Sequence, residues 1–214
     1  MKFVISYSCG KDSTLALHKM LAAGHQPVGL LVMVNRQAQR SWFHGVEPEL
    51  LTAIADCLQI PLICCYSQED GKDYHTVLED GLRQAKALGA TACVFGDIDI
   101  QDHFDWGAAR CQAVGLQAVF PLWQRNRREN TEEILALGYQ CLIKCVRNQD
   151  LPQRFLGNIL DAAMVAEMTA LGVDVCGENG EYHTLVVDGP IFRRPVPYCC
   201  QKALEMCIRD RRRR

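Results

Sequence analysis

The stretch most able to perform chemistry is residues 8–14, with the sequence Ser-Cys-Gly-Lys-Asp-Ser-Thr. It follows the apolar run 3–5 and precedes the apolar-periodic residues 15–21, so it is predicted to join a strand to a helix by a tight glycine turn. Such a turn aims several backbone N–H groups at one point, and the helix N-terminus adds about half a positive charge. The pattern therefore indicates a phosphate-binding loop. The alternative is an ordinary strand-to-helix turn in which the Asp and Ser cap the helix.

The individual residues of this loop suggest what its ligand needs. The loop differs from a Walker A motif, because Ile5 stands where that motif has its first glycine and Asp12 follows the lysine. Gly10 allows a ligand to approach the backbone closely, and Lys11 either adds positive charge at the phosphates or faces solvent. A carboxylate beside phosphate requires a cation between the two, so we expect Asp12 to bind Mg²⁺. The residues expected to bind the nucleotide, some by their hydroxyl groups, are Ser8, Cys9, Gly10, Lys11, Asp12, Ser13 and Thr14.

A second polar pair, Gly96 and Asp97, follows the strand predicted at 92–95. Because the carboxyl ends of parallel strands meet at one edge of a sheet, this pair and the first loop are expected on one rim and in one nucleotide site. Asp97 is a second candidate for the metal or for ordering the loop, and its alternative role is to cap the helix that follows. Adenine is expected against the end of the second strand, near residues 32–34.

The segment 176–184, Cys-Gly-Glu-Asn-Gly-Glu-Tyr-His-Thr, gathers two carboxylates, an amide and an imidazole. By itself it is also typical of an Asn-Gly turn with solvated acids. As a site it would bind a substrate and handle a proton, a task in which general acid–base groups contribute about 10²–10⁴-fold. The candidate catalytic residues are Asp12, Glu178, Glu181 and His183. Asn179 and Arg125, the first of a basic stretch at 125–128, are candidates for binding the substrate.

The apolar pattern of the first 120 residues alternates strand and helix. Strands are predicted at 2–7, 27–34, 60–66, 92–95 and 117–119, and helices at 13–23, 47–58, 73–88 and 102–114. This order predicts an α/β fold with a doubly wound parallel sheet, which binds ligands beyond the carboxyl ends of its strands. The later elements are predicted at 129–137 (helix), 139–146 (strand), 159–171 (helix) and 182–187 (strand). We expect a nucleotide-binding domain at 1–120, a smaller C-terminal α/β subdomain at 121–200 that packs over the nucleotide rim, and a disordered basic tail at 201–214.

Composition narrows the class of protein. The 214 residues carry a net charge of −2, which gives no general attraction to nucleic acid. No apolar run approaches the ~20 residues that span a bilayer, and no signal peptide is evident, so a cytoplasmic protein without a membrane partner is expected. Twelve cysteines allow a disulfide framework, but many lie within apolar segments, which favours buried free thiols. The absence of a C-x-x-C pair argues against a structural zinc site.

These motifs together resemble the diphthine–ammonia ligase family, a branch of the PP-loop ATP pyrophosphatases with the adenine nucleotide α-hydrolase-like (HUP) fold. Residues 8–13 resemble the SxGKDS loop of that superfamily, and residues 177–184 resemble the family's GENGEYHT motif. Further similar segments are the Ser-aromatic-x-His element at 41–44, Gly96-Asp97-Ile98 with Trp106, Pro121-Leu122-Trp123 with the arginines at 125–128, and residues 189–192. The resemblance covers about residues 1–195.

The resemblance implies an ATP-dependent amide ligase. In such an enzyme a carboxylate attacks ATP to form an acyl-adenylate, pyrophosphate leaves, and ammonia displaces AMP. ATP and Mg²⁺ are the implied cofactors, the acyl substrate is diphthine on translation elongation factor 2, and His44 becomes a candidate for binding it. A homodimer is one option that the sequence leaves open.

Two departures and two alternatives remain. Cys9 stands where the family usually has glycine, which is tolerable if this position needs no positive φ, and His44 is followed by Gly45-Val46. One alternative is the same adenylation of another small carboxylate or of an RNA base. The other is a nucleotide-binding sensor of the universal-stress type without turnover. The loop at 8–14 together with the acidic motif favours catalysis.

Overall fold

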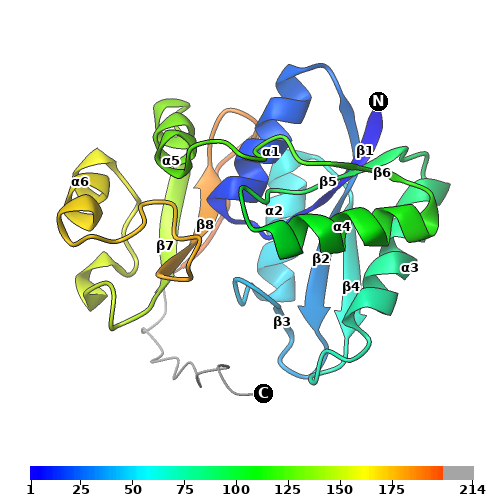
Figure 1. Cartoon of the computed structure of the whole chain (residues 1–214), viewed down its shortest axis with the longest axis horizontal. Helices are drawn as coiled ribbons and strands as arrows, with labels where there is room; N and C mark the ends of the chain where they lie inside the picture. Colours follow the sequence, from blue (N-terminus) through cyan, green and yellow to red (C-terminus); the bar gives the residue numbers. More distant parts are fainter. Residues whose placement is uncertain (200–214) are drawn as a thin grey trace.

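Five parallel strands in the order β4-β2-β1-β5-β6 form the centre of the protein, whose computed structural model describes residues 1–199 (Figure 1). A sixth, two-residue strand, β3, pairs antiparallel with the end of β2, and β7 and β8 form a separate antiparallel pair. The elements of the main sheet and its connections are β1 (Lys2–Ser6), α1 (Lys11–Ala22), β2 (Gln26–Asn35), β3 (Arg40–Ser41), α2 (Pro48–Leu58), β4 (Leu62–Ser67), α3 (Tyr74–Ala87), β5 (Ala92–Val94), α4 (Gln101–Val114) and β6 (Gln117–Val119). The remaining elements are α5 (Arg127–Ala136), β7 (Gln140–Val146), the 3₁₀ turn η1 (Gln153–Phe155), α6 (Ala162–Ala170) and β8 (Tyr182–Asp188).

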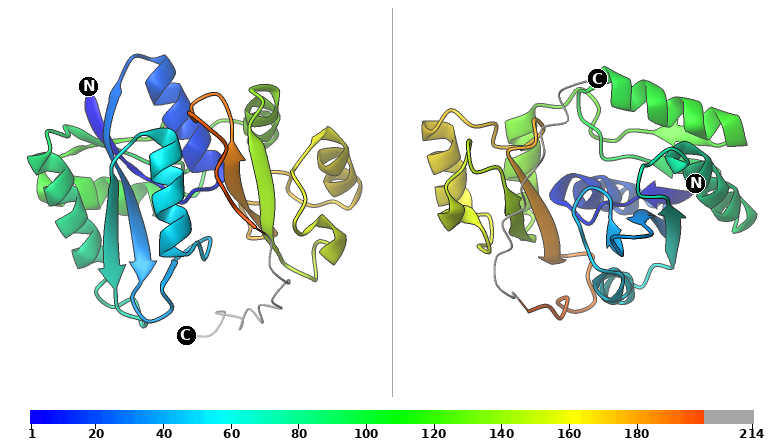
Figure 2. Two further views of the ribbon diagram at one scale, coloured as in Figure 1. Left: turned by 180° about the vertical axis from the view of Figure 1, so that it is seen from behind. Right: turned by 90° about the horizontal axis from the view of Figure 1, so that it is seen from below.

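Helices cover both faces of the sheet, as the strand pattern predicts. Successive side chains of a strand point to opposite faces. Phe3 and Ile5 therefore pack with α1 and α2, whereas Val4 packs with α3 and α4. Figure 2 shows these two pairs of helices on opposite faces of the sheet. The chain reverses its direction of winding between β1 and β5. This doubly wound α/β fold leaves a crevice at the carboxyl ends of those two strands, where ligands of such sheets bind.

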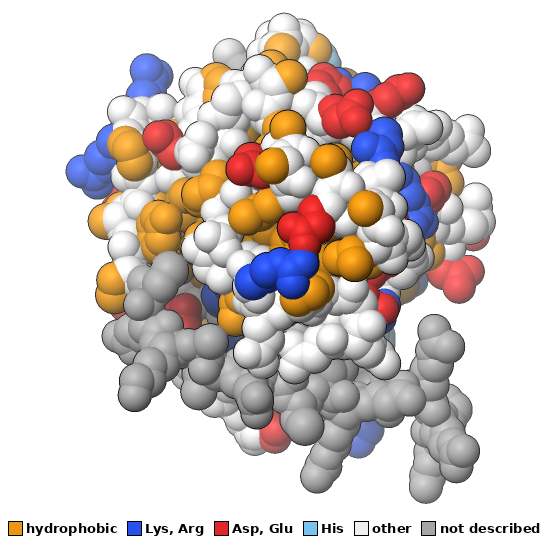
Figure 3. Space-filling view, turned by 90° about the vertical axis from the view of Figure 1, so that its left-hand side faces the viewer, with side chains coloured by type: hydrophobic (Ala, Val, Ile, Leu, Met, Phe, Trp, Pro, Cys, Tyr) orange, Lys and Arg blue, Asp and Glu red, His pale blue; other side chains and the backbone are white. Residues whose placement is uncertain are grey.

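The C-terminal part of the chain packs beside α1. Helix α1 contacts both α5 and β8, and one continuous apolar core contains Leu15 and Leu17 of α1 together with Leu185 and Val186 of β8. The face at the left of Figure 1, where α6 lies, mixes hydrophobic side chains with charged ones (Figure 3). The homodimer stays a prediction, and the predicted tail at 201–214 lies outside the described residues.

Several predicted helix ends were wrong by a few residues, for identifiable reasons. Helix α1 starts at Lys11, two residues earlier than predicted, because Gly10 is its N-cap in an extended conformation. The predicted helix at 159–171 begins only at Ala162, since the Asp161 side chain caps it by accepting from Met164 N at 2.8 Å. Ile159 instead forms a β-bridge with Leu142.

The cysteines of the described chain carry free thiols, and most of them are buried, which confirms that part of the sequence-based prediction. None of the helices among residues 1–199 has both the length and the hydropathy to cross a membrane.

Candidate functional site

A cleft of about 460 Å³ opens at the carboxyl ends of β1 and β5. Its walls come from the loop after β1, the start of α1, the loop before α2, the starts of α3 and α4, and the segment around the start of β8. The lining residues are Ser6, Ser8, Lys11, Asp12, Ser13, Phe43, His44, Tyr74, Phe95, Gly96, Asp97, Ile100, His103, Trp106, Cys176, Gly177, Glu178, Gly180, Tyr182, His183 and Thr184. The two motifs from opposite ends of the chain therefore face one another across this cleft.

The N-terminus of α1 points into the cleft without a side-chain cap. The N–H of Lys11 donates to Thr184 Oγ1 at 3.1 Å, and the Asp12 and Ser13 N–H groups lie in the first turn, where no earlier helical carbonyl can accept them. The hydroxyls of Ser8 and Ser13 lie 3.1 Å apart at the same place. This arrangement offers free donors and the positive end of the helix dipole to an anion.

Two glycines keep this helix end open. A methyl group on Gly96 would lie 2.8 Å from Ser13 N and 2.9 Å from Ser13 Cα, so the strand end of β5 can approach α1 only as glycine. A methyl group on Gly10 would lie 2.4 Å from Cε1 of His44. Gly10 does not itself line the cleft, and its role in this structure is to make room for the His44 ring.

Lys11 is buried, which excludes the solvent-facing alternative. Its side chain is 4% exposed, and Nζ lies 2.7 Å from Asp12 Oδ2 and 2.5 Å from the carbonyl oxygen of Cys176. Burial alone would lower the pKa of Lys11, but the neighbouring Asp12 charge, with Cys176 and Tyr182, raises it well above its usual value. Lys11 is therefore a charged group that ties α1 to the segment around Cys176.

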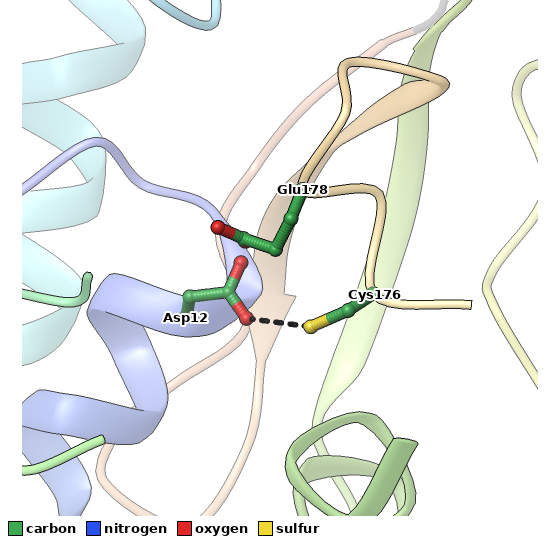
Figure 4. A group of neighbouring side chains, drawn as sticks. All are labelled: Asp12, Cys176 and Glu178. Atoms are coloured by element: carbon green, nitrogen blue, oxygen red, sulfur yellow. Dashed lines mark hydrogen bonds between the residues drawn. The ribbon is translucent and has the colours of Figure 1, made fainter. Parts of the chain in front are cut away.

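Asp12, Glu178 and Cys176 converge at one point of the cleft (Figure 4). Their donor atoms lie within 4.8 Å of one another, and the carboxyl groups of Asp12 and Glu178 point toward each other. Burial, together with the nearby Asp12 charge, raises the pKa of Glu178 to about 7. Burial also raises the pKa of the Cys176 thiol to about 12, so that sulfur is a poor ligand for a hard cation. Two crowded carboxylates fit Mg²⁺, which prefers oxygen ligands and would relieve their repulsion.

His44 and His183 lie side by side in the cleft with ring centroids 5.0 Å apart. His44 Nδ1 lies 2.7 Å from the Thr184 carbonyl oxygen, which can only accept, so Nδ1 carries the proton and Nε2 is the free acceptor. Burial, together with the nearby His183, lowers the pKa of His44 to about 3. Burial likewise lowers the pKa of His183, so both imidazoles are neutral at pH 7.

Some residues assigned to the site from sequence lie outside the cleft lining. The Thr14 side chain is fully buried, and its hydroxyl bonds the Gly10 carbonyl at 2.9 Å and Tyr7 Oη at 3.0 Å. Cys9 is also buried, and its φ is 67°. A cysteine in place of the family's glycine was expected to be tolerated only if this position needs no positive φ, and the position does have a positive φ. The Cys9 carbonyl oxygen accepts from Val186 N at 2.9 Å, which docks the loop onto β8.

Three further candidates, Glu181, Asn179 and Arg125, do not line the cleft and contact neighbouring residues instead. Glu181 is 6% exposed and accepts from Asn179 N and Nδ2 at 3.1 and 3.0 Å, which holds the turn rather than facing the cleft. Arg125 pairs with Glu133 at 2.7 Å. Arg127 is the arginine nearest the motif: it bonds Asp99 through two nitrogens, Asp174 through a third, and lies 3.4 Å from Asn179 Oδ1.

Asp97 lines the cleft, but the capping alternative was wrong. Helix α4 starts at Gln101 with Ile100 as its N-cap, and Asp97 instead lies 3.2 Å from Nδ1 of His103. Hydrogen bonding to Asp97 raises the pKa of His103.

The adenine position expected near residues 32–34 stays a prediction. These residues are buried and do not line the cleft. The Met33 carbonyl accepts from Trp42 N at 3.1 Å, because β3 folds back along the end of β2.

Sequence reasoning missed the aromatic side of the cleft. Its side chains are Phe43, Tyr74, Phe95 and Trp106. Phe43 and Trp106 stand inside segments that carried the family resemblance, whereas Tyr74 opens α3 without any sequence signal. Their common position follows only from how the loop before α2, the start of α3, the end of β5 and helix α4 meet above the sheet.

Comparison with known proteins matches both parts of the chain. Residues 1–118 match the family model for the diphthamide synthase N-terminal domain, and residues 126–199 match that for the diphthamide synthase C-terminal domain. The diphthine–ammonia ligase of Homo sapiens is 25% identical over 227 residues, and that of Bos taurus is 27% identical over 219 residues. Each alignment covers 92% of this chain and 82% of the relative. Among solved structures, a predicted subunit of tRNA methyltransferase from Methanocaldococcus jannaschii aligns with 92% of this chain and 100% of its own, at 13% identity and a TM-score of 0.47.

Proposed function

Since the chain belongs to the diphthamide synthase family, we propose that it is an ATP-dependent ligase that joins ammonia to a carboxylate and releases AMP and pyrophosphate. The acyl substrate in this proposal is diphthine, which the relatives' name includes, carried on elongation factor 2. The observation that supports this most is that the open N-terminus of α1 and the Glu178 segment share one cleft. A phosphate site and a second polar site are then close enough for one reaction.

The residues around α1 suit the leaving pyrophosphate. The N–H groups of Asp12 and Ser13 and the charged Lys11 supply fixed positive potential where negative charge develops, which is the main protein contribution to phosphoryl and nucleotidyl transfer. Asp12 and Glu178 would hold Mg²⁺, whose chemistry there is to neutralise phosphate charge.

The histidines suit the second half of the reaction. Ammonia attacks only as the free base, so a proton has to leave ammonium or the attacking nitrogen. His183 is neutral at pH 7 and lines the cleft, which makes it our candidate proton acceptor. His44 has too low a pKa for that task, and we assign it to holding the substrate through Nε2.

The test is AMP formation from ATP in the presence of elongation factor 2 carrying diphthine, with and without ammonium. We expect AMP to appear only when both the carboxylate and ammonium are present. Glu178→Gln should slow amide formation at least about tenfold, which corresponds to about 1.4 kcal/mol in barrier height, because it removes a charge from the metal site. Glu132→Gln, on the exposed face of α5, is the matched control and should keep full activity.

The alternatives give different results in the same assay. A binding-only sensor would bind ATP without forming AMP. A ligase for another carboxylate would form AMP with that acid and none with the elongation factor. Full activity of a folded Glu178→Gln variant would mean that Asp12 binds the metal without Glu178.

A further inference from the structure

Arg127, the first residue of α5, joins two walls of the cleft from outside its lining. Its Nε and Nη2 donate to the two carboxylate oxygens of Asp99 at 2.6 and 2.7 Å, and its Nη1 donates to Asp174 Oδ2 at 2.5 Å. Asp99 belongs to the connection between β5 and α4, in which Asp97 lines the cleft. Asp174 lies just before the segment that carries Glu178. We call Asp99, Arg127 and Asp174 the Arg127 clasp, and it links the main sheet to the segment before β8.

Asp174 connects the clasp to the backbone that carries Glu178. Its Oδ1 accepts from Cys176 N at 2.9 Å, and its Oδ2 accepts from Glu178 N at 3.3 Å. The Glu178 side chain then extends from this backbone toward Asp12 of α1 (Figure 4). Because Arg127 bonds the same carboxylate of Asp174, the clasp fixes where the backbone of Glu178 lies relative to α1.

The turn around Glu178 has hydrogen bonds of its own, so the clasp sets its placement rather than its shape. Gly177 N donates to the Asp174 carbonyl oxygen at 3.0 Å, and Gly180 N donates to the Gly177 carbonyl oxygen at 3.0 Å. These bonds stay within the segment and do not reach the main sheet. The clasp supplies a connection that does.

A guanidinium group suits this task better than an ammonium group. Its planar fork bonds one carboxylate through two nitrogens and keeps a third nitrogen for the other carboxylate, which fixes the two acids relative to each other. The side chains of Arg127 and Asp174 are 29% and 14% exposed. Partly exposed ion pairs contribute little to overall stability, so the geometry of this one points to placement of the segment as its role.

We propose that Arg127 is a positioning residue, which holds the segment before β8 where Glu178 and Asp12 can bind one Mg²⁺ together. This deepens the proposed function: it rests on the metal role given there to the two carboxylates, and not on the identity of the acyl substrate. Neither Arg127 nor Asp99 lines the cleft, so both residues act through the segment rather than by touching a ligand.

Charge and placement predict opposite effects of removing Arg127. If only its charge mattered, loss of this cation would strengthen the binding of a metal ion nearby. If Arg127 positions Glu178, its loss weakens metal binding, because one of the two carboxylates is no longer held at the site. Groups that orient metal ligands in this way typically contribute 10–100-fold in metal affinity.

The experiment measures the affinity of the full chain for Mn²⁺ alone by electron paramagnetic resonance titration. We expect Arg127→Gln to bind Mn²⁺ at least about tenfold more weakly than the unaltered chain. Asp99→Ala should show a similar loss, and the double variant should lose no more than either single variant, since both residues act through one contact. Arg83→Gln is the matched control and should keep its affinity, because Arg83 also bonds two carboxylates, on α3 outside the cleft lining.

A second measurement needs no metal. Hydrogen exchange of the Cys176 and Glu178 amides, followed by NMR, reports whether Asp174 still holds them. We expect exchange at least about fivefold faster in Arg127→Gln and Asp99→Ala than in the unaltered chain, and no change in Arg83→Gln. Thermal unfolding of each variant checks that the fold is retained.

Two results would overturn the proposal and leave the proposed function standing. One is an Arg127→Gln variant that binds Mn²⁺ as tightly as the unaltered chain or more tightly. The other is a folded Arg127→Gln variant with unchanged exchange of both amides. An unaltered chain that binds no Mn²⁺ would instead overturn the metal role of Asp12 and Glu178, and this inference with it. The ligase assay distinguishes these cases, because it measures AMP formation by the unaltered chain.

Discussion

Cys9 stands in a left-handed conformation, φ 67°, that residues other than glycine adopt at a cost of about 1–2 kcal/mol. The turn is required because the Cys9 carbonyl must reach Val186 N of β8. The buried side chain offsets part of this cost by packing in the core. Strain and burial therefore oppose one another at a single residue of the phosphate loop.

We predict that the free energy of unfolding of Cys9→Gly is at least as large as that of Cys9→Ala. Both variants lose the buried sulfur, but only glycine relieves the strain, a gain of about 1 kcal/mol that exceeds its usual entropic penalty. Urea denaturation of the two variants at one pH measures the difference. A clearly more stable Cys9→Ala would mean that the positive φ carries no strain.

His44 makes the stability of the protein sensitive to mild acid. The pKa of His44 is about 3 in the folded protein and about 6.5 when unfolded, so only the unfolded chain takes up this proton as the pH falls. The contribution of neutral His44 to the free energy of unfolding is fully present above pH 6.5 and is lost progressively below that pH. Between pH 7 and pH 5 we expect about 2 kcal/mol of the free energy of unfolding to be lost through this residue.

The measurement is urea denaturation at pH 7 and pH 5 for the unaltered chain and for His44→Gln. The variant should lose less stability over this interval, because glutamine does not titrate. His25→Gln removes an imidazole at the N-terminus, away from the cleft, and serves as the control. An identical pH dependence in His44→Gln and the unaltered chain would contradict the burial argument.

Among the elements, α1 and the end of β5 depend most closely on one another. An added methyl group at Gly96 meets the α1 backbone at Ser13 N, which cannot yield as a flexible side chain would. We predict that Gly96→Ala weakens ATP binding at least about fivefold, because overpacking of this kind costs about 1–3 kcal/mol and moves the donors of the first helical turn. Calorimetric titration with ATP tests this.

Gly107→Ala is the matched control in α4. Its methyl group would approach only the ring edges of Phe120 and Phe95, at 3.3 Å, and alanine is the better helix former. ATP affinity should be retained there. Equal affinities in both alanine variants would show that the contact between Gly96 and α1 does not shape the nucleotide site.

At the scale of the whole molecule, the C-terminal part holds the loop that carries His44. Lys144 of β7 donates to the carbonyl oxygens of His44 and Gly45, at 3.0 and 2.5 Å. We predict that Lys144→Met lowers the free energy of unfolding by about 1–3 kcal/mol, since it leaves these carbonyls without their donor. The variant should also raise KM for the acyl substrate, because His44 loses its support.

Lys144→Arg keeps a donor and should recover most of the stability. Lys72→Met, whose side chain is 84% exposed, controls for loss of a lysine and should change stability by less than about 0.5 kcal/mol. Thermal and urea denaturation measure both effects. A Lys144→Met variant as stable as Lys72→Met would mean that the two parts are joined by the apolar core alone.

The local pattern of the sequence was sufficient to predict the strands and helices and the position of the first loop. Apolar periodicity located the strands and helices of the main sheet, because burial imposes periods of 2 and 3.6 residues directly on the chain. The doubly wound sheet and the shared rim of Ser8 and Asp97 followed from connection rules that hold for all such sheets. Helix ends such as that of α6 were missed, since one capping side chain decides them.

The tertiary structure decided which polar residues face the cleft. Glu178 and Glu181 stand three positions apart in one motif, yet Glu178 points at Asp12 while Glu181 turns back to bond Asn179. Thr14 is likewise turned into the core one position after Ser13, which lines the cleft. The direction of a side chain within a turn depends on contacts with distant segments. The aromatic side of the cleft likewise depends on distant segments that meet there, since Phe43, Tyr74 and Trp106 come from three separate parts of the chain. Residue types and spacing predicted the chemistry, and long-range packing decided which residues are placed to perform it.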